Sequence, residues 1–293
     1  MRGGSMKHQN FLSILTRCRD EFFIKEWVDY YLSQGVDSIY IMDDDSEDKS
    51  IYEFVSNKEY KNVNIIYEKR NYATINTDDQ CQLNKNSSVN KIFRSQIKNK
   101  YEWLIYCDVD EFMVTKKQFD LTIRERLQTI PNDVTCIHVP WVFMSGAKLI
   151  ENPKSVLKEV LYRHDHDKKH PHSVQKFRCR YELIEYKSIL RTSSYEYLND
   201  HFPSPNGKSV NGCSLYSSRL HEGKFSKLRN EDIESGEFLC YHYRYISDEN
   251  AKDKLNTNGW YVNDGYNFED LKSSSYPEIY DDTLLRKMEN KII

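Results

Sequence analysis

Short apolar runs alternate with amphipathic helix patterns along the first half of the chain, and this alternation restricts the possible folds more than any other feature. Apolar runs predict strands at 11–16, 38–42, 63–67, 103–107 and 134–143. The first helix pattern is the stripe Ile24, Trp27, Val28, Tyr31 and Leu32, which Gly35 ends. Repeated strand–helix units predict an α/β fold, with a mainly parallel sheet that carries helices on both faces.

Polar residues suited to helix N-termini precede three of the helix patterns. Asp20, Ser88 and Asp120 stand in these positions. The second half of the chain is less regular. It is interpreted as a charged, His-rich segment at 151–175, two strands within 177–190, mostly loop at 199–236, a strand at 238–245 and short helices within 248–290. Residues 68–87 are polar and predict a long loop. No linker or repeat divides the chain, so a single domain with an elaborated second half is expected.

The scarcity of glycine limits how such a sheet can hold a phosphate. The chain has 10 glycines, and none of them forms a G-x-G-x-x-G motif. Gly207 and Gly212 have the spacing of a P-loop, but Cys213 stands where that motif has lysine. Any bound phosphate must therefore be held by side chains, a metal ion or a helix N-terminus.

Charge and cysteine content exclude further classes of protein. The 42 basic and 45 acidic residues give a net charge of −3, so a broad nucleic-acid-binding surface is not expected. No apolar run is long enough to predict a membrane span. The 7 cysteines form no C-x-x-C pair, which favours free thiols in a reducing compartment. With no signal-peptide pattern either, a cytoplasmic protein is expected, and residues 1–7 are interpreted as a leader.

Acidic residues follow two of the predicted strands directly. Asp43-Asp44-Asp45 ends the second strand, and Asp108-x-Asp110 ends the fourth. Since the carboxyl ends of parallel strands meet at one edge of a sheet, these groups should share a rim that attracts cations. Two carboxylates in one turn can bind Mg²⁺ or Mn²⁺, which prefer oxygen ligands and share them with phosphates. The alternative is a solvated turn or a helix cap, where Asp is common in any protein.

The histidines carry less information. The alternation of His164, His166, His170 and His172 can suggest zinc, but the neighbouring Asp and Lys residues and Pro171 favour a solvated loop. His201 and His242 are isolated, and an isolated His is more often structural than a ligand. His242 follows the apolar stretch 238–241, so it can point into the same cleft as the aspartates.

Four segments together resemble a known family. They are Leu15-Thr-Arg-Cys-Arg-Asp-Glu21, Lys25-Glu-Trp27, Gly35-Val-Asp-Ser-Ile-Tyr-Ile-Met-Asp-Asp-Asp-Ser46 and Trp103-Leu-Ile-Tyr-Cys-Asp-Val-Asp-Glu-Phe112. Shorter matches follow in the same order: Trp141-Val-Phe143 with Gly146, Lys187-Ser-Ile189, His201-Phe202 and His242-Tyr243. The chain resembles the family 2-like glycosyltransferases, closest to the branch that includes glycosyltransferase family 92. It departs from that pattern at Asp20, where Asn is usual, and at Ile246, where Lys is frequent.

This resemblance implies a GT-A fold and sugar transfer from a nucleotide-diphospho-sugar, most simply a UDP-sugar, to a glycan, lipid-linked or protein acceptor. It implies one GT-A domain at 8–293, with a nucleotide-binding half at 8–115 and an acceptor half at 116–293. The implied nucleotide-sugar residues are Thr16, Glu21, Asp43, Asp44, Asp108 and Lys187. Asp108, Asp110 and His242 are the implied ligands of Mn²⁺ or Mg²⁺, and Trp141 faces the acceptor.

The catalytic assignments are the least constrained by the sequence. Asp110 is predicted to act in catalysis through the metal, because a cation held by carboxylates neutralises a departing diphosphate. An inverting enzyme also needs a base on the acceptor hydroxyl, for which His201, Glu222 and Glu237 are candidates. Two other classes stay open at this stage: a sugar-phosphate nucleotidyltransferase and a non-catalytic carbohydrate-binding protein. The first usually has a glycine-rich loop after its first strand, which Thr16-Arg17-Cys18-Arg19 does not supply.

Overall fold

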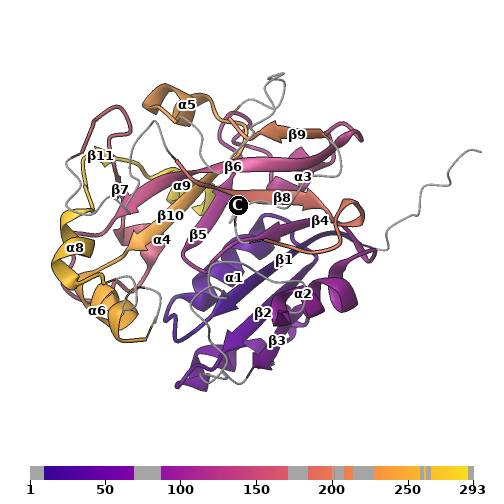
Figure 1. Ribbon diagram of the computed structural model, residues 1–293, viewed down its shortest axis with the longest axis horizontal. Coiled ribbons are helices and arrows are strands. Elements are labelled where there is room, and N and C mark those ends of the chain that lie inside the picture. The colour runs from indigo at the N-terminus through magenta and orange to yellow at the C-terminus, as the bar shows by residue number, and fades with distance from the viewer. Residues whose placement is uncertain are drawn as a thin grey trace, which may run out of the picture.

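One mixed sheet organises the molecule. The computed structural model describes residues 10–68, 87–170, 184–199, 201, 208–213, 228–257, 261 and 265–289. Within these ranges 11 strands form a continuous sheet, whose main path runs β11-β7-β6-β8-β4-β1-β2-β3. Figure 1 shows the N-terminal strands together on one side and the long strand β6 crossing the other half.

The N-terminal half of the sheet is parallel. Its strands are β1 (Asn10–Cys18), β2 (Ser38–Asp44), β3 (Val63–Glu68) and β4 (Tyr101–Tyr106). They lie side by side in the order β4-β1-β2-β3, with every neighbouring pair parallel. The strands expected from the apolar runs are confirmed here, and the carboxyl ends of β1, β2 and β4 share one rim.

Helices cover both faces of this parallel part. Helix α1 (Ile24–Ser33) packs in the same core cluster as Ile14 and Ile39. Helix α2 (Ser88–Ile92), continued by the π-helical turn η4 (Phe93–Ile97), packs with Leu15 and Tyr40. Successive residues of a strand point to opposite faces, so the two clusters lie on opposite sides of the sheet. This arrangement confirms the α/β architecture expected from the sequence.

The expected helix caps were each displaced. Helix α1 begins after Phe23, which makes no side-chain cap, and helix α2 is capped by Ser87 rather than Ser88. Helix α3 (Ile123–Leu127) begins after Thr122 and not at Asp120, because Thr122 and Glu125 form a complete capping box there.

Asp20 instead connects two loops. Its backbone φ is 52°, its amide donates to Ser46 Oγ at 3.0 Å, and its carboxylate accepts from the amide of Asp48 at 3.0 Å. The segments that follow β1 and β2 are therefore joined beside the rim. The η1 helix (Lys49–Ser56) follows, with Asp48 as its cap, and is of the 3₁₀ type.

The C-terminal half is mixed rather than parallel. Its long strand β6 (Val134–Ser145) pairs with β8 (Tyr186–Arg191) antiparallel and with β9 (Lys208–Asn211) and β10 (Leu239–Tyr245) parallel. Strand β8 also pairs antiparallel with β4, which joins the two halves. Strand β10 in turn pairs antiparallel with β5 (Glu111–Val114). Neither β5 nor β9 was predicted, because each is only 4 residues long.

Short elements complete the fold. They are η2 (Lys58–Tyr60), α4 (Val156–Glu159), β7 (Tyr162–Arg163), η5 (Thr192–Ser194), α5 (Asn230–Ser235), α6 (Asp248–Thr257), α8 (Phe268–Ser273), β11 (Ile279–Tyr280) and α9 (Thr283–Glu289). The short helices expected near the C-terminus are confirmed, and α6 and α8 lie together at one edge (Figure 1). No helix within the described ranges is long and apolar enough to span a membrane. The 5 described cysteines are free thiols, as expected.

Candidate active site

The turn after β4 presents two carboxylates at the sheet rim. Asp108 and Asp110 follow the strand, and Glu111 begins β5 with no exposed surface. The Glu111 carboxylate accepts from the amide of Asp108 at 2.8 Å, and the amide of Glu111 donates to the carbonyl of Asp108 at 3.1 Å. These two bonds fix the turn, so both aspartates are held in place by local structure.

Strand pairing brings His242 to Asp110 from far along the chain. In the β5–β10 ladder His242 lies opposite Glu111, and the amide of Tyr243 donates to the carbonyl of Asp110 at 2.7 Å. The His242 Nε2 atom lies 3.6 Å from Asp110 Oδ1. The other ring nitrogen, Nδ1, is buried and has no hydrogen-bond partner within the described part of the chain.

Each aspartate also meets a buried lysine. Lys187 on β8 places Nζ 2.8 Å from Asp108 Oδ2, and only 2% of its side chain is exposed. Lys254 on α6 places Nζ 2.7 Å from Asp110 Oδ2, and 11% of its side chain is exposed. The lysines therefore approach the turn from two different elements, one in the sheet and one in a C-terminal helix.

These neighbours change the pKa values of the acids. Burial alone would raise the pKa of Asp110, but Lys254 and His242 hold it well below its usual range. The pKa of Asp108 is also lowered, because Lys187 and Arg17 outweigh its burial. Burial lowers the pKa of His242 despite Asp110, which favours the neutral ring that a metal ligand requires.

Glu21 has the opposite shift. Burial raises its pKa to about 7, with Lys254 opposing this shift and Asp110 adding to it. Its position just after β1 agrees with the expected site at the shared rim. Three expected site residues, Glu21, Asp110 and His242, are thus electrostatically connected through one group of side chains around Lys254.

Aromatic contacts extend the site toward His201. The Trp141 ring lies between two imidazoles, with ring centroids 4.4 Å from His242 and 5.4 Å from His201. The buried indole Nε1 of Trp141 has no hydrogen-bond partner among the residues described. His201 Nδ1 lies 3.3 Å from the carbonyl of Tyr186, and its Nε2 lies 3.7 Å from Glu185 Oε2. Trp141 and His201 therefore border the same region as Asp110.

The other expected nucleotide-sugar residues lie at the ends of β1 and β2. Thr16 is fully buried, and its hydroxyl donates to the carbonyl of Arg17 at 3.1 Å. Asp43 is also buried, and its carboxylate is bound by Lys49 and by the Tyr52 hydroxyl. These partners give Asp43 a structural role at the start of η1. Asp44 is the last residue of β2 and is partly exposed.

Of the two remaining candidates for a base, the structure describes only Glu237. Glu237 is buried against Arg126, with Oε2 at 3.1 Å from the guanidinium Nε, and Lys117 lies on its other oxygen. This carboxylate stabilises the fold. Glu222 lies outside the described residues.

The expected solvated loop around the histidines was wrong. His164, His166 and His170 are buried, and Nε2 of the last lies 2.7 Å from Glu278 Oε2, at hydrogen-bond distance. Stacking on Phe143 and Tyr276 explains their burial. Among the described residues no group of three or more His, Cys, Asp or Glu side chains is arranged to hold a metal, and His172 lies outside those residues. Zinc at this position therefore has no structural support.

Three residues of the site were missed by the sequence reasoning. Glu111 belongs to the same motif as the two aspartates, but only the structure shows its carboxylate turned back on the chain. Glu185 lies in an irregular segment without a pattern. Lys254 had no available signal, because its burial beside Asn250 and Ala251 on a strongly polar helix is visible only in the structure.

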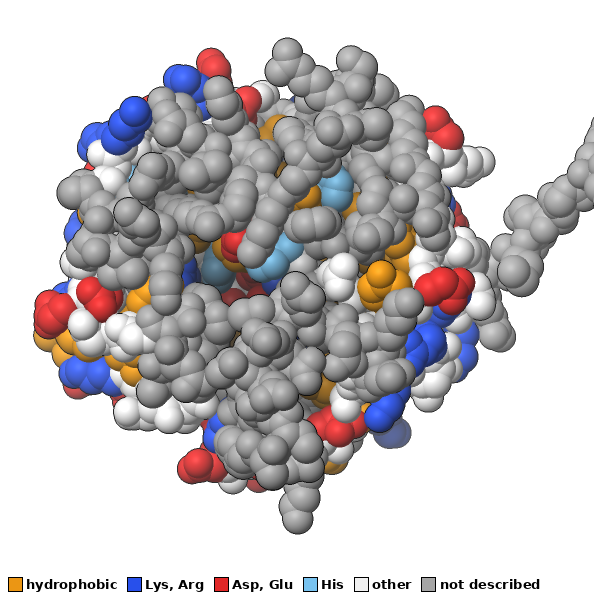
Figure 2. All heavy atoms as spheres, viewed as in Figure 1, with side chains coloured by type: hydrophobic (Ala, Val, Ile, Leu, Met, Phe, Trp, Pro, Cys, Tyr) orange, Lys and Arg blue, Asp and Glu red, His pale blue; other side chains and the backbone are white. Residues whose placement is uncertain are grey.

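The site opens on one face of the molecule. Figure 2 shows histidine and acidic side chains gathered in a hollow near the centre of this face. The side-chain exposure of Asp108, 41%, agrees with an open rim, whereas the 15% exposure of Asp110 places that residue deeper. A ligand entering from this side would meet Asp108 first.

Comparisons with known proteins identify the family. The model of glycosyltransferase family 92 matches residues 20–284, which is most of the chain. No curated protein sequence matches significantly.

Solved structures give weak likenesses only. They include residues 1–349 of S. aureus TarS, at 14% identity and a TM-score of 0.34, and the same protein in complex with UDP, at a TM-score of 0.37. Both matches cover 62% of this chain and 47% of TarS, so the chain spans about half of that protein's length. HddC from Yersinia pseudotuberculosis matches at 10% identity and a TM-score of 0.35, over 69% of this chain and 89% of that one.

Proposed function

Because the chain belongs to glycosyltransferase family 92 and is a glycosyltransferase, we propose that it transfers a sugar from a UDP-sugar to a hydroxyl of a glycan, lipid-linked or protein acceptor in a metal-dependent reaction. The observation that carries this proposal is the meeting of Asp108, Asp110 and His242 at one rim, from two segments that lie far apart in the sequence. Family membership favours this function over nucleotide transfer to a sugar phosphate and over non-catalytic carbohydrate binding.

The donor types at this rim suit a divalent cation, although among the described residues Asp108, Asp110 and His242 do not form a preformed metal group. Two carboxylates and a neutral imidazole are the ligand types that Mn²⁺ accepts, and Mg²⁺ would use the carboxylates. The 3.6 Å between His242 Nε2 and Asp110 Oδ1 allows both atoms to contact one ion. A bound cation would neutralise the negative charge that develops on the departing diphosphate.

Lys187 would also neutralise the negative charge of the departing diphosphate. Its ammonium is buried beside Asp108 at 2.8 Å and lies 3.7 Å from Glu111 Oε2. Held by two carboxylates, the lysine stays in place at the rim where the diphosphate would lie. We assign it to binding the donor phosphates, with Asp108 contacting the nucleotide side of the donor.

His201 is the candidate base for an inverting transfer. Since the carbonyl of Tyr186 can only accept, the Nδ1 atom that faces it carries the ring proton. In the neutral ring Nε2 then holds the lone pair, which can take the proton of an acceptor hydroxyl. Glu185 Oε2, 3.7 Å from Nε2, would stabilise the imidazolium that forms.

Trp141 is positioned to contact the acceptor. Its ring contacts both His201 and His242, so it borders the candidate base and the candidate metal ligand. Its indole N–H lacks a partner among the described residues, and an acceptor hydroxyl would satisfy it. Aromatic rings are also suitable surfaces for the apolar face of a sugar.

A thermal-shift panel tests the proposal. Nucleotide-sugars that differ in base and sugar are added with Mn²⁺ or with EDTA, and the melting temperature is compared with that of the protein alone. A UDP-sugar should raise the melting temperature only with Mn²⁺. Stabilisation that is equal in EDTA would refute metal dependence, and stabilisation by no nucleotide-sugar under either condition would refute the assignment of this donor.

A further inference from the structure

Lys254 is a buried cation at the point where the metal is expected. Its Nζ lies 2.7 Å from Asp110 Oδ2, while the other oxygen of the same carboxylate faces His242 at 3.6 Å. The ammonium also lies 3.4 Å from the carbonyl of Arg244. Both oxygens of Asp110 thus have partners, one cationic and one a candidate metal ligand.

The helix that carries Lys254 also has anchors elsewhere. Helix α6 is anchored separately at its first residue, where Asp248 binds Lys272 at 2.6 Å and the Tyr245 hydroxyl at 2.6 Å. Its apolar contacts are made through Ala251 in a cluster with Tyr245 and Leu271. The pairing of Lys254 with Asp110 offsets the cost of burying the ammonium. Because that partner is also the candidate metal ligand, the pairing places Lys254 in the site itself.

A divalent cation and Lys254 would share one carboxylate. Two positive groups bound to opposite oxygens of Asp110 repel each other at a few ångströms. The negative charge of a donor diphosphate relieves this repulsion. Lys254 should therefore lower the affinity of the site for metal in the free protein and raise it in the nucleotide-bound protein.

We propose that Lys254 is a built-in cation of the diphosphate site, which competes with the divalent metal for Asp110 until the nucleoside diphosphate binds and then contacts its phosphates. This inference rests on the proposed function, because it takes the diphosphate and the metal as ligands. The lysine would keep Asp110 neutralised in the resting enzyme. It would also couple metal binding to donor binding. The diphosphate relieves the repulsion between the metal and Lys254, so each ligand should bind more tightly when the other is present.

Two binding measurements on Lys254→Met test the inference. Free Mn²⁺ is followed by electron paramagnetic resonance during titration of the nucleotide-free protein, and UDP binding is measured by calorimetry in EDTA. Removing the ammonium should tighten Mn²⁺ binding about 10-fold and weaken metal-free UDP binding about 10-fold, each about 1.4 kcal/mol. A purely structural lysine would lower both affinities together, and that result, or no change in either, would overturn the inference.

Matched variants make the result specific. Lys272→Met removes an ammonium that binds the same helix at Asp248 and should change neither affinity. Lys254→Arg retains the charge and should keep UDP binding in EDTA near that of the wild type. If Lys254→Met does not fold, Lys254→Gln is measured in its place with the same expectations.

The wild-type titrations distinguish a failure of the proposed function from a failure of the role given to Lys254. Wild-type protein that binds neither UDP nor Mn²⁺ would refute the proposed function and this inference with it. Wild-type protein that binds both, beside a Lys254→Met variant with unchanged affinities, would refute this inference alone.

Discussion

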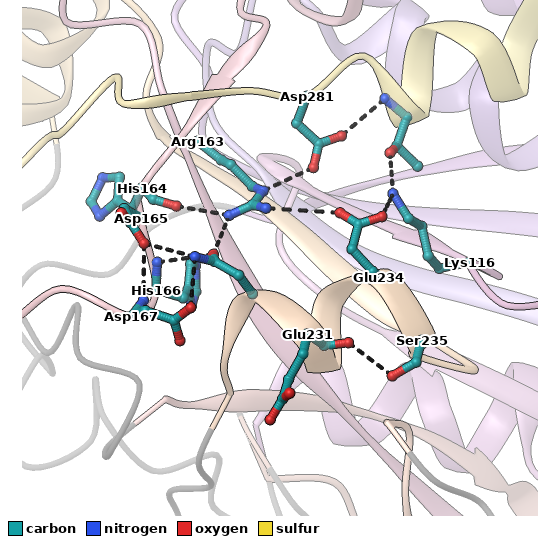
Figure 3. Close-up of polar contacts among 12 residues, drawn as sticks. Lys116, Arg163, His164, Asp165, His166, Asp167, Glu231, Glu234, Ser235 and Asp281 are labelled. Carbon is teal, nitrogen blue, oxygen red and sulfur yellow. Dashed lines mark hydrogen bonds and ion pairs between the residues drawn. The ribbon is translucent and has the colours of Figure 1, made fainter.

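Two groups of buried charges in this molecule look alike and are built differently. Around Arg163, the guanidinium binds Asp281 at 3.0 Å, Asn230 Oδ1 at 2.7 Å and the carbonyl of His164 at 3.0 Å (Figure 3). Asp281 in turn accepts from the Tyr241 hydroxyl and from the amide of Thr283. Every contact of this Arg163 cluster joins parts of the C-terminal half, and the charges balance within it.

The group around Asp110 does not balance in this way. It draws its side chains from the loop after β1, the turn after β4, and from β8, β10 and α6. Three of its buried polar atoms have no partner among the residues described: His242 Nδ1, Glu111 Oε1 and Trp141 Nε1. Beside Arg163 the Nδ1 atom of His166 also has none among those residues, so unsatisfied atoms alone do not separate the two groups. The carboxylates and lysines around Asp110 converge on a rim where Asp108 is 41% exposed, whereas Arg163 and Asp281 are both buried. We therefore infer that the Arg163 cluster stabilises the fold and that the Asp110 group binds ligands.

The largest expected effect comes from breaking the Arg163 cluster. Arg163→Met leaves Asp281 as a buried, unpaired carboxylate and should lower the free energy of unfolding by about 3–5 kcal/mol. Urea unfolding measures this loss. Under folding conditions the KM for the donor should be unchanged, and a rise in KM at full stability would contradict the structural role.

The next largest effect is on catalysis and concerns the group around Asp110. His201→Ala should lower kcat by about 10²–10⁴-fold, because it removes the candidate base. Donor binding in the thermal-shift assay should persist, which separates catalysis from folding. Glu185→Gln serves as the graded control and should have a smaller effect on kcat. An unchanged kcat in His201→Ala would assign the base elsewhere.

Acid should weaken the region next to Arg163 through His166. Burial lowers the pKa of His166 to about 3, against 6.5 for a free imidazole. Between these values the unfolded chain binds the proton and the folded one does not, so stability falls as pH falls below 6.5. At pH 5 the contribution of His166 alone should be a loss of about 2 kcal/mol relative to pH 7.5. Urea titrations of His166→Gln at both pH values should show a smaller loss, and an equal loss would exclude His166 as the cause.

Glu21 should give the site the opposite dependence on pH. Its pKa is raised from 4.5 to about 7, so between these values the folded protein binds the proton and the unfolded chain does not. Stability should therefore fall as pH rises from 4.5 to 7, by about 1–2 kcal/mol after allowance for partial exposure. In metal-free protein Glu21→Gln should remove this slope. A slope that persists in the variant would contradict the assignment.

The sequence could predict the features that local patterns determine, but not those that tertiary contacts determine. The parallel strands, the two helix-covered faces and the acidic strand ends follow from local patterns, and the structure confirms them. Asp108 and Asp110 were identifiable because a single turn holds both. The meeting of His242 with Asp110 was expected only through the family resemblance, because the register of the β5–β10 ladder sets it.

The missed features depend on tertiary contacts. Lys254 lies on a polar helix whose position no periodicity fixes, and the burial of His164, His166 and His170 depends on stacking against Phe143 and Tyr276. The engagement of Asp43 by Tyr52 likewise requires the η1 helix to fold back on β2. Local sequence could not supply any of these three contacts.

Metal-dependent release of UDP is the decisive readout for the proposed site. Release of UDP from the UDP-sugar that stabilises the protein is measured for the wild type and for Asp110→Asn, each with Mn²⁺ and with EDTA. The proposed metal site predicts release by the wild type with Mn²⁺ and a loss of at least about 10²-fold in the other three conditions. Undiminished release by Asp110→Asn in EDTA would contradict it.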